Sequence, residues 1–270
     1  MTVETAPAPE APETPAAPRP PRRRLRALAR WATAVLVCGG VGTGVAYGIT
    51  SMDRGDVPGL ATASDGRWAY PKLALPALPE GSPRPFTEGN EGEVHHADPR
   101  ALLLPAPAGA VVDKGLDGGW VTVDRYLAEY EPDQRAELRQ ALTDLAVRNI
   151  TARGWTMPDG TRSRVYLLRF GSVAYAQMFQ SENLRAGADA GVPPTGSPVL
   201  EPDGEWPGPD LVQDTSSYAY EETKPYGPER TRLAYIVAGD TVAMIVQSRK
   251  GDTAEVPFHQ TVVLQNQLLG

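Results

Sequence analysis

The stretch of the chain that most limits its fold runs from Trp31 to Ile49, WATAVLVCGGVGTGVAYGI, and contains no charged side chain. Its length is close to the roughly 20 residues that a helix needs to cross the hydrocarbon core of a membrane. Five arginines precede the stretch: Arg22, Arg23, Arg24, Arg26 and Arg30. Basic residues favour the cytoplasmic side of a membrane. The sequence therefore predicts a transmembrane helix over residues 31–50, with the N-terminus in the cytoplasm and the rest of the chain outside.

Other interpretations of this stretch differ in how well they fit. A nucleotide-binding loop is excluded, because Val45 stands where a dinucleotide fingerprint starting at Gly40 needs glycine, and no Gly-Lys-Ser/Thr follows. Cleavage as a signal peptide near Ala46 stays open, although the arginine cluster begins late for a signal. A buried glycine-rich helix or a flexible linker also stays open. The uncharged length after the arginines favours a retained single-pass anchor.

Three glycines in this stretch, Gly40, Gly44 and Gly48, recur every four residues and so share roughly one face of a helix. Small residues at this spacing let two helix backbones approach closely within a membrane. The pattern predicts a helix-packing face, used in a homodimer or against another transmembrane helix. The alternative is that a high content of glycine and alanine produces the spacing by chance.

Charge is distributed unevenly along the 270 residues. Residues 1–30 carry six arginines and three glutamates, whereas residues 51–270 carry 20 basic and 30 acidic side chains. Such an acidic portion repels nucleic acid at long range, so we expect no nucleic-acid partner. The single cysteine, Cys38, lies in the uncharged stretch. No intramolecular disulfide is available, and the exported portion has to be stabilised by its own core.

Composition divides the chain into four parts. Residues 1–30 are a Pro/Ala-rich tail with a basic end, for which we expect disorder in the cytoplasm. Residues 31–50 are the expected transmembrane helix. Residues 51–97 are rich in Pro and Gly, which predicts an extended extracytoplasmic linker. The folded extracytoplasmic domain is expected over residues 98–270.

Within that domain, a hairpin pattern followed by a helical pattern occurs twice. Pro158-Asp159-Gly160 is a turn signal between two strand-like runs, and Gly239-Asp240 joins two apolar runs. Helical patterns follow each hairpin, and an amphipathic pattern precedes the first one over residues 132–149. The predicted fold is α+β: an antiparallel sheet with helices packed on one face, preceded by a single transmembrane helix and Pro-rich segments.

Three segments carry a resemblance to a known group: LLLPAPAGA, ARGWTMPDGTRSRVYLLRFGSVAYAQMFQ and RLAYIVAGDTVAMIVQS. Through them, roughly residues 98–250 resemble uncharacterised exported, membrane-anchored proteins of high-GC actinobacteria. The resemblance implies location and style of fold. It carries over no functional residue, because that group has no established activity. The order of hairpins and helices also resembles extracytoplasmic sensor domains, as an analogy of fold.

Motifs for catalysis and metal binding give little support to an enzyme. Neither Gly-x-Ser-x-Gly, Ser-x-x-Lys nor His-Glu-x-x-His occurs. His95, His96 and Asp98 have metal-ligand types, but adjacent residues do not share a face of a helix or strand. We therefore expect them to lie in a solvated linker, and we expect no metal, no cofactor and no catalytic residue.

Acidic and aromatic residues leave two alternatives open. Asp203, Glu205 and Asp210 surround Trp206 and form either an acidic surface loop or the carboxylate pair of a hydrolase. A set of aromatic residues either lines a binding groove or fills half-buried strand positions; its members are Trp155, Tyr166, Tyr218, Tyr220, Tyr226 and Tyr235.

Together these observations favour a non-catalytic protein of the cell envelope. We expect a binding or sensor-like domain, held at the cell membrane by one helix, that recognises an unidentified envelope ligand or protein. The alternative is an envelope hydrolase that uses Asp and Glu carboxylates.

Overall fold

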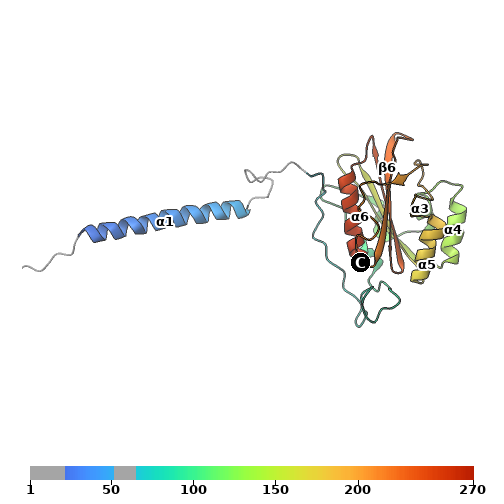
Figure 1. The fold of residues 1–270 in the computed structure, drawn as a ribbon, viewed down its shortest axis with the longest axis horizontal. Helices are drawn as coiled ribbons and strands as arrows, with labels where there is room; N and C mark the ends of the chain where they lie inside the picture. The colour runs from blue at the N-terminus through green and yellow to red at the C-terminus, as the bar shows by residue number, and fades with distance from the viewer. Residues whose placement is uncertain (1–21, 52–64) are drawn as a thin grey trace, which may run out of the picture. The chain divides into compact units, whose positions relative to one another are not determined.

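The structure is a computed structural model that describes residues 22–51 and 65–270. The chain divides into two compact units, Met1–Ala63 and Ser64–Gly270. Among the described residues, the first unit holds one helix, α1 (Arg22–Ser51), and the second unit holds a sheet with the other helices (Figure 1).

Helix α1 contains the whole uncharged stretch that the sequence singles out. Its segment Leu28–Val45 has a mean hydropathy of 1.3 and is long and apolar enough to cross a membrane. Membrane anchors and N-terminal signal sequences both have such segments, so the hydropathy identifies an apolar helix but does not assign its orientation in a membrane. Gly40 and Gly44 lie in this helix, and an added Cβ at either position would meet no atom within 4 Å.

The second unit is built around one seven-stranded antiparallel sheet with the strand order β1-β2-β3-β7-β6-β5-β4. The strands are β1 (Val111–Trp120), β2 (Asn149–Thr156), β3 (Arg162–Arg169), β4 (Glu201–Pro202), β5 (Thr215–Glu221), β6 (Glu229–Ala238) and β7 (Thr241–Lys250). The helices are α2 (Pro99–Leu102), α3 (Val123–Leu127), α4 (Arg135–Asp144), α5 (Val173–Met178), the π-helix η2 (Phe179–Leu184) and α6 (Glu255–Leu269).

Both faces of the sheet are buried. On β6, Leu233 and Tyr235 belong to a core cluster that includes side chains of α3, α4 and α5. The alternate residues Ala234 and Ile236 belong to a second cluster that includes side chains of α6. The sheet is therefore the middle of three layers (Figure 1).

The predicted α+β class with one antiparallel sheet is confirmed. The expectation that helices pack on one face needs correction, because α6 lies on one face and α3, α4 and α5 lie on the other (Figure 1). Strands β6 and β7 give the physical reason. Burial along both strands is nearly continuous instead of alternating, and a strand buried on both faces needs a covering layer on each side.

Residues 65–97, called the strap below, lie along the face of the sheet that carries α6. The half-buried Trp68, Tyr70 and Phe86 pack against the second cluster. The Trp68 backbone N–H donates to Gln260 Oε1 at 2.8 Å, and Tyr70 Oη lies 2.9 Å from Thr261 Oγ1. The strap therefore belongs to the same compact unit as the sheet. Apolar side chains between the prolines cover part of the core, which removes them from water.

The two hairpins expected from turn signals are present. β2 and β3 flank the Pro158-Asp159-Gly160 turn, and β6 and β7 flank Gly239-Asp240. Gly239 has φ +48°, and a Cβ there would lie 2.1 Å from the Glu93 carbonyl oxygen of the strap. The hairpin therefore needs glycine both for its backbone conformation and for the close approach of the strap.

Candidate ligand-binding cleft

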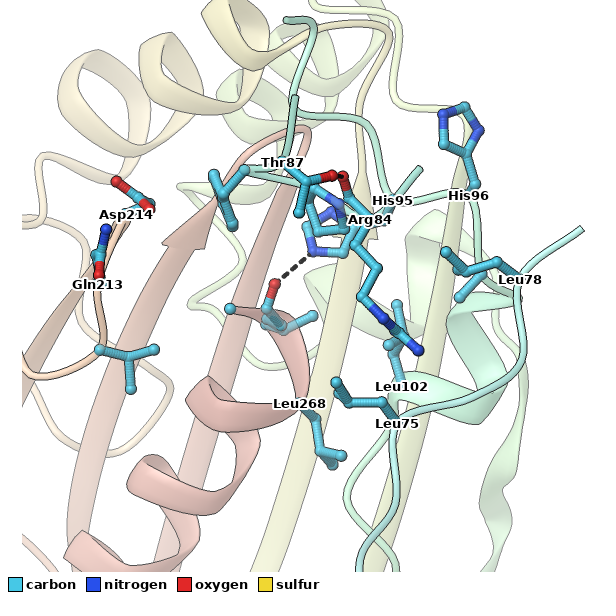
Figure 2. Close-up of a pocket in the computed structure, with 16 residues that line it drawn as sticks. Leu75, Leu78, Arg84, Thr87, His95, His96, Leu102, Gln213, Asp214 and Leu268 are labelled. Carbon is cyan, nitrogen blue, oxygen red and sulfur yellow. Dashed lines mark hydrogen bonds between the residues drawn. The ribbon is translucent and has the colours of Figure 1, made fainter. Parts of the chain in front are cut away.

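A cleft of about 350 Å³ lies between the strap, residues 212–214 and the C-terminal end of α6 (Figure 2). Leucines make up much of its wall: Leu75, Leu78, Leu102, Leu268 and Leu269. The polar side chains that line it are Arg84, His95, His96, Thr87, Gln213 and Asp214. An apolar hollow with a few polar groups is the usual composition of a small-molecule site.

A turn of the strap over residues 84–94 sets the positions of Arg84 and His95. The buried Asn90 side chain holds this turn, because its Nδ2 donates to the carbonyl oxygens of Arg84 and Val94 at 3.0 and 2.9 Å. Its Oδ1 accepts a hydrogen bond from the Val94 N–H at 3.0 Å. An amide offers donors and an acceptor at once, so one asparagine can join both ends of the turn.

His95 lies at the base of the cleft and is only 2% exposed. Its Nδ1 lies 2.8 Å from Asp240 Oδ1. Its Nε2 lies 2.8 Å from the Leu269 carbonyl oxygen (Figure 2). A backbone carbonyl oxygen can only accept, so Nε2 donates to Leu269 while Nδ1 is paired with the Asp240 carboxylate. This one side chain therefore connects the strap to the β6–β7 turn and to the end of α6.

Asp240 interacts with His95 and with Arg169 of β3. The Arg169 Nε donates to Asp240 Oδ2 at 3.0 Å, and the His95 backbone N–H donates to Oδ1 at 3.2 Å. Burial raises the pKa of Asp240, but its hydrogen bond and charge interaction with His95 and the charge of Arg169 outweigh burial and hold the pKa below its ordinary value of 3.8. The cluster is satisfied internally and presents no free base to the cleft.

Arg84 differs from this cluster because its guanidinium has little to bind. It is half-buried, and its one hydrogen bond within the described residues is a long one, from Nη2 to the Pro76 carbonyl oxygen at 3.4 Å. No carboxylate of residues 65–270 forms an ion pair with it. In Figure 2 its side chain extends toward Leu75 and Leu102. A cation with unused donors thus lies inside a mostly apolar cleft.

The structure separates the three residues that the sequence groups as metal-ligand types. His95 is buried in the cluster with Asp240, which differs from the solvated linker expected, whereas His96 is half-buried on the cleft wall. Asp98 caps α2 by accepting from the Arg100 N–H at 2.9 Å. Within residues 22–51 and 65–270, no three His, Cys, Asp or Glu side chains come together as a metal site.

The acidic loop near Trp206 contains one buried carboxylate and two exposed ones. Asp203 Oδ2 accepts from Arg232 Nη1 at 2.6 Å and lies 2.7 Å from His259 Nε2. Burial raises the pKa of Asp203, but the hydrogen bond and charge of His259 and the charge of Arg232 hold it below 3.8. Glu205 and Asp210 are exposed. This loop does not pair two free carboxylates, which the hydrolase alternative would need.

Most of the aromatic residues that offered a groove are core residues. Trp155, Tyr166, Tyr220 and Tyr235 are fully buried, so the strand interpretation holds for them. Tyr235 continues a buried chain of hydroxyls, with Tyr130 Oη 3.0 Å away and Tyr126 Oη a further 2.7 Å from Tyr130. Burial raises the pKa of each of these three phenols, so they remain neutral hydrogen-bonding groups.

The residues proposed for the anchor belong to the first unit, whereas the cleft belongs to the second unit. Gly40, Gly44 and Gly48 are part of α1, as are Arg22, Arg23, Arg24, Arg26 and Arg30 at its start. Nothing in the structure tests their roles in packing and topology, which stay predictions.

The chain is weakly similar to a solved structure. No known protein family matches the sequence, and no curated protein matches it. Among solved structures, the extracellular domain of PknH from Mycobacterium tuberculosis is similar, with 10% sequence identity and a TM-score of 0.33. The match covers 63% of this chain and 93% of that chain. A similarity of this size supports no conclusion about function, and the resemblance to an actinobacterial group stays a prediction.

Sequence reasoning missed Arg84 and Asp240 for different reasons. Arg84 lies in the Pro-rich run SPRPF, which gives no periodicity that would place it in a folded wall. Asp240 occupies a turn position, where aspartate is common for local reasons. The signal for Asp240 was its charge between two fully apolar runs, because a carboxylate there needs partners from elsewhere in the chain.

Proposed function

We propose that this protein is a single-pass, membrane-anchored extracytoplasmic protein whose domain Ser64–Gly270 binds a ligand in the cleft without transforming it. The observation that carries the proposal is the state of the polar groups. His95 and Asp240 are engaged with each other and with Arg169 and Leu269. The Arg84 guanidinium has free donors, and Leu75 in the cleft wall is 44% exposed, so both can contact a ligand. Binding needs such free contacts, whereas acid–base catalysis needs a free acid or base.

The anchoring part of the proposal is supported by α1 and by the distribution of charge. The segment Leu28–Val45 has the length and hydropathy of a membrane span. Arginines cluster before it, which favours a cytoplasmic N-terminus and an external C-terminal domain. The acidic character of residues 51–270 disfavours nucleic acid and anionic membrane surfaces as partners.

The helix-packing part concerns Gly40, Gly44 and Gly48. An added Cβ at Gly40 or Gly44 would meet no atom within 4 Å, so among the described residues these positions have no neighbour that accounts for a missing side chain. We propose that this face packs against a second copy of α1 or against another transmembrane helix.

A thermal-shift screen of the full chain in lipid nanodiscs tests ligand binding. Wall fragments and other envelope molecules are added at saturating concentrations. Binding at about 100 times Kd contributes roughly 2.7 kcal/mol, so a ligand raises Tm by roughly 5 °C or more. Leu75→Trp, at a side chain that is 44% exposed and lines the cleft, fills the site with little effect on the core and abolishes the shift.

Val256→Trp is the matched control, since Val256 is 41% exposed on α6 and lies outside the cleft lining. This variant keeps the shift if the ligand binds in the cleft. A screen that finds no stabilising molecule, or a shift that persists in Leu75→Trp, contradicts the proposal.

A further inference from the structure

We infer that the cleft takes a single-chain amphiphile with an anionic head, whose acyl chain lies among the leucines and whose head binds Arg84. This inference rests on the proposed function, because it names the class of ligand for the same cleft. Carboxylate and phosphate heads share the required chemistry: two or more oxygen acceptors on a negatively charged group.

The unused donors of Arg84 provide the first step of the argument. A guanidinium has five N–H donors in a planar fork, and Arg84 uses one of them in a long hydrogen bond to the Pro76 carbonyl oxygen. The guanidinium is half-buried, and its remaining donors are open to the solvent of the cleft, because none of its nitrogens is a buried atom without a partner. His95, by contrast, has its partners inside the protein. Arg84 is therefore the group in this cleft for which an external anion offers the greatest gain.

The apolar wall provides the second step. Leu75 and Leu78 come from the strap, Leu102 from α2 and Leu268 from α6, so four side chains on three segments converge on one hollow (Figure 2). The volume of about 350 Å³ is near the lower end of the range of roughly 300–1,000 Å³ for small-molecule sites. This size favours one short chain over a two-chain lipid, and burial of each methylene adds to the affinity.

The distribution of charge sets the direction in which the ligand lies. Asp214 is the acidic side chain among the lining residues, and Figure 2 shows it across the cleft from Arg84. Asp214 is exposed and repels an anion at its side of the opening. An anionic head is therefore favoured at Arg84 and disfavoured at the opposite rim.

Photo-crosslinking tests the inference with the full chain in nanodiscs of zwitterionic phosphatidylcholine. The probe is decanoic acid that carries a diazirine in its chain, and mass spectrometry maps the labelled peptides. We expect labelling of peptides that contain Leu75, Leu102 or Leu268. Unlabelled decanoate and decyl phosphate compete, whereas decanol, decyltrimethylammonium and acetate compete at least about tenfold less well. Lysophosphatidic acid and two-chain phosphatidic acid distinguish a single-chain ligand from a membrane phospholipid.

Two variants separate the role of Arg84 from general effects on the domain. Arg84→Gln removes the positive charge and lowers labelling at least about tenfold, since hydrogen bonds between charged groups are stronger than those between neutral groups. Arg67→Gln, at an exposed arginine of the same strap that pairs with Asp65, leaves labelling unchanged. The melting temperatures of both variants are compared with that of the unaltered chain, and equal values show that the fold is intact.

Equal competition by decanol and decanoate, unchanged labelling in Arg84→Gln, or labelling outside the cleft overturns the inference. These outcomes differ from failure of the proposed function. A neutral ligand that binds the cleft in the thermal-shift screen would leave ligand binding in place and reject only the anionic class.

Discussion

His95 shows how much of this fold depends on one polar side chain in a buried position. Its ring is paired with Asp240 and donates to the Leu269 carbonyl, and Asp240 in turn accepts from Arg169. Strap, sheet and C-terminal helix therefore meet at a single cluster of charges. Removing one member of a buried ion pair is strongly destabilising, because the remaining charge is left without a partner.

Asp240→Asn is expected to lower the free energy of unfolding by about 3–5 kcal/mol at neutral pH. The control is Asp252→Asn, because the Asp252 side chain is 79% exposed and its ion pair with Arg230 contributes less than about 1 kcal/mol. Urea unfolding of both variants provides the measurement. Equal stability of Asp240→Asn and the unaltered chain would mean that the cluster does not hold the fold.

The same cluster gives an acid dependence with a defined sign. The pKa of Asp240 is lower in the folded chain than its ordinary value of 3.8, so its contribution is complete above that value and is lost as pH falls through the lower, folded pKa. Stability is therefore expected to fall below about pH 4. Asp240→Asn lacks this carboxylate and should show a shallower loss over the same range, although Asp203 contributes in the same direction.

At the level of elements, the two hairpins were predictable because their turns are strong local signals. Pro158-Asp159-Gly160 and Gly239-Asp240 each separate apolar runs, and no distant contact is needed to locate them. Strand β1 was not predicted, since Asp and Gly occupy half of its ten positions, and their preference is for turns. Its pairing with β2 is interrupted by register shifts, which only the neighbouring strand reveals.

The strap could not be predicted from its own sequence. The prolines predict that no regular helix or central strand forms there, and residues 65–97 contain neither. What composition does not show is that Trp68 and Phe86 cover an apolar surface formed by residues far along the chain. The cleft could not be predicted for the same reason, because its walls come from three segments that are distant in sequence.

Helix α1 permits a direct test of its glycine face. Gly44→Ile, at the centre of the row Gly40, Gly44 and Gly48, separates two packed helices and is expected to weaken self-association several-fold in a membrane two-hybrid assay. Gly42→Ile is the control, since two residues place it on about the opposite face. Membrane insertion survives both changes, because isoleucine is more apolar than glycine. Equal effects of the two substitutions, or no association of the unaltered chain, would mean that the glycine spacing reflects composition alone.

At the scale of the whole molecule, the chain combines an apolar helix with a domain that has its own core on both faces of a sheet. Residues 51–270 have a net charge of −10, whereas residues 1–30 have a net charge of +3. This asymmetry fits an anchor with its basic end in the cytoplasm. A ligand of the envelope reaches the cleft only if the domain is exported, so topology is the claim on which the proposed function depends.

Cysteine labelling in intact cells tests that claim most directly, because Cys38 is the single cysteine of the chain and Cys38→Ser removes it. In that background, Gly227→Cys places a thiol on an exposed loop where an added Cβ meets no atom within 4 Å. We expect a membrane-impermeant maleimide to label Gly227→Cys in intact cells and to label Ala8→Cys only after permeabilisation. Labelling of Ala8→Cys in intact cells, with Gly227→Cys protected until permeabilisation, would contradict this topology.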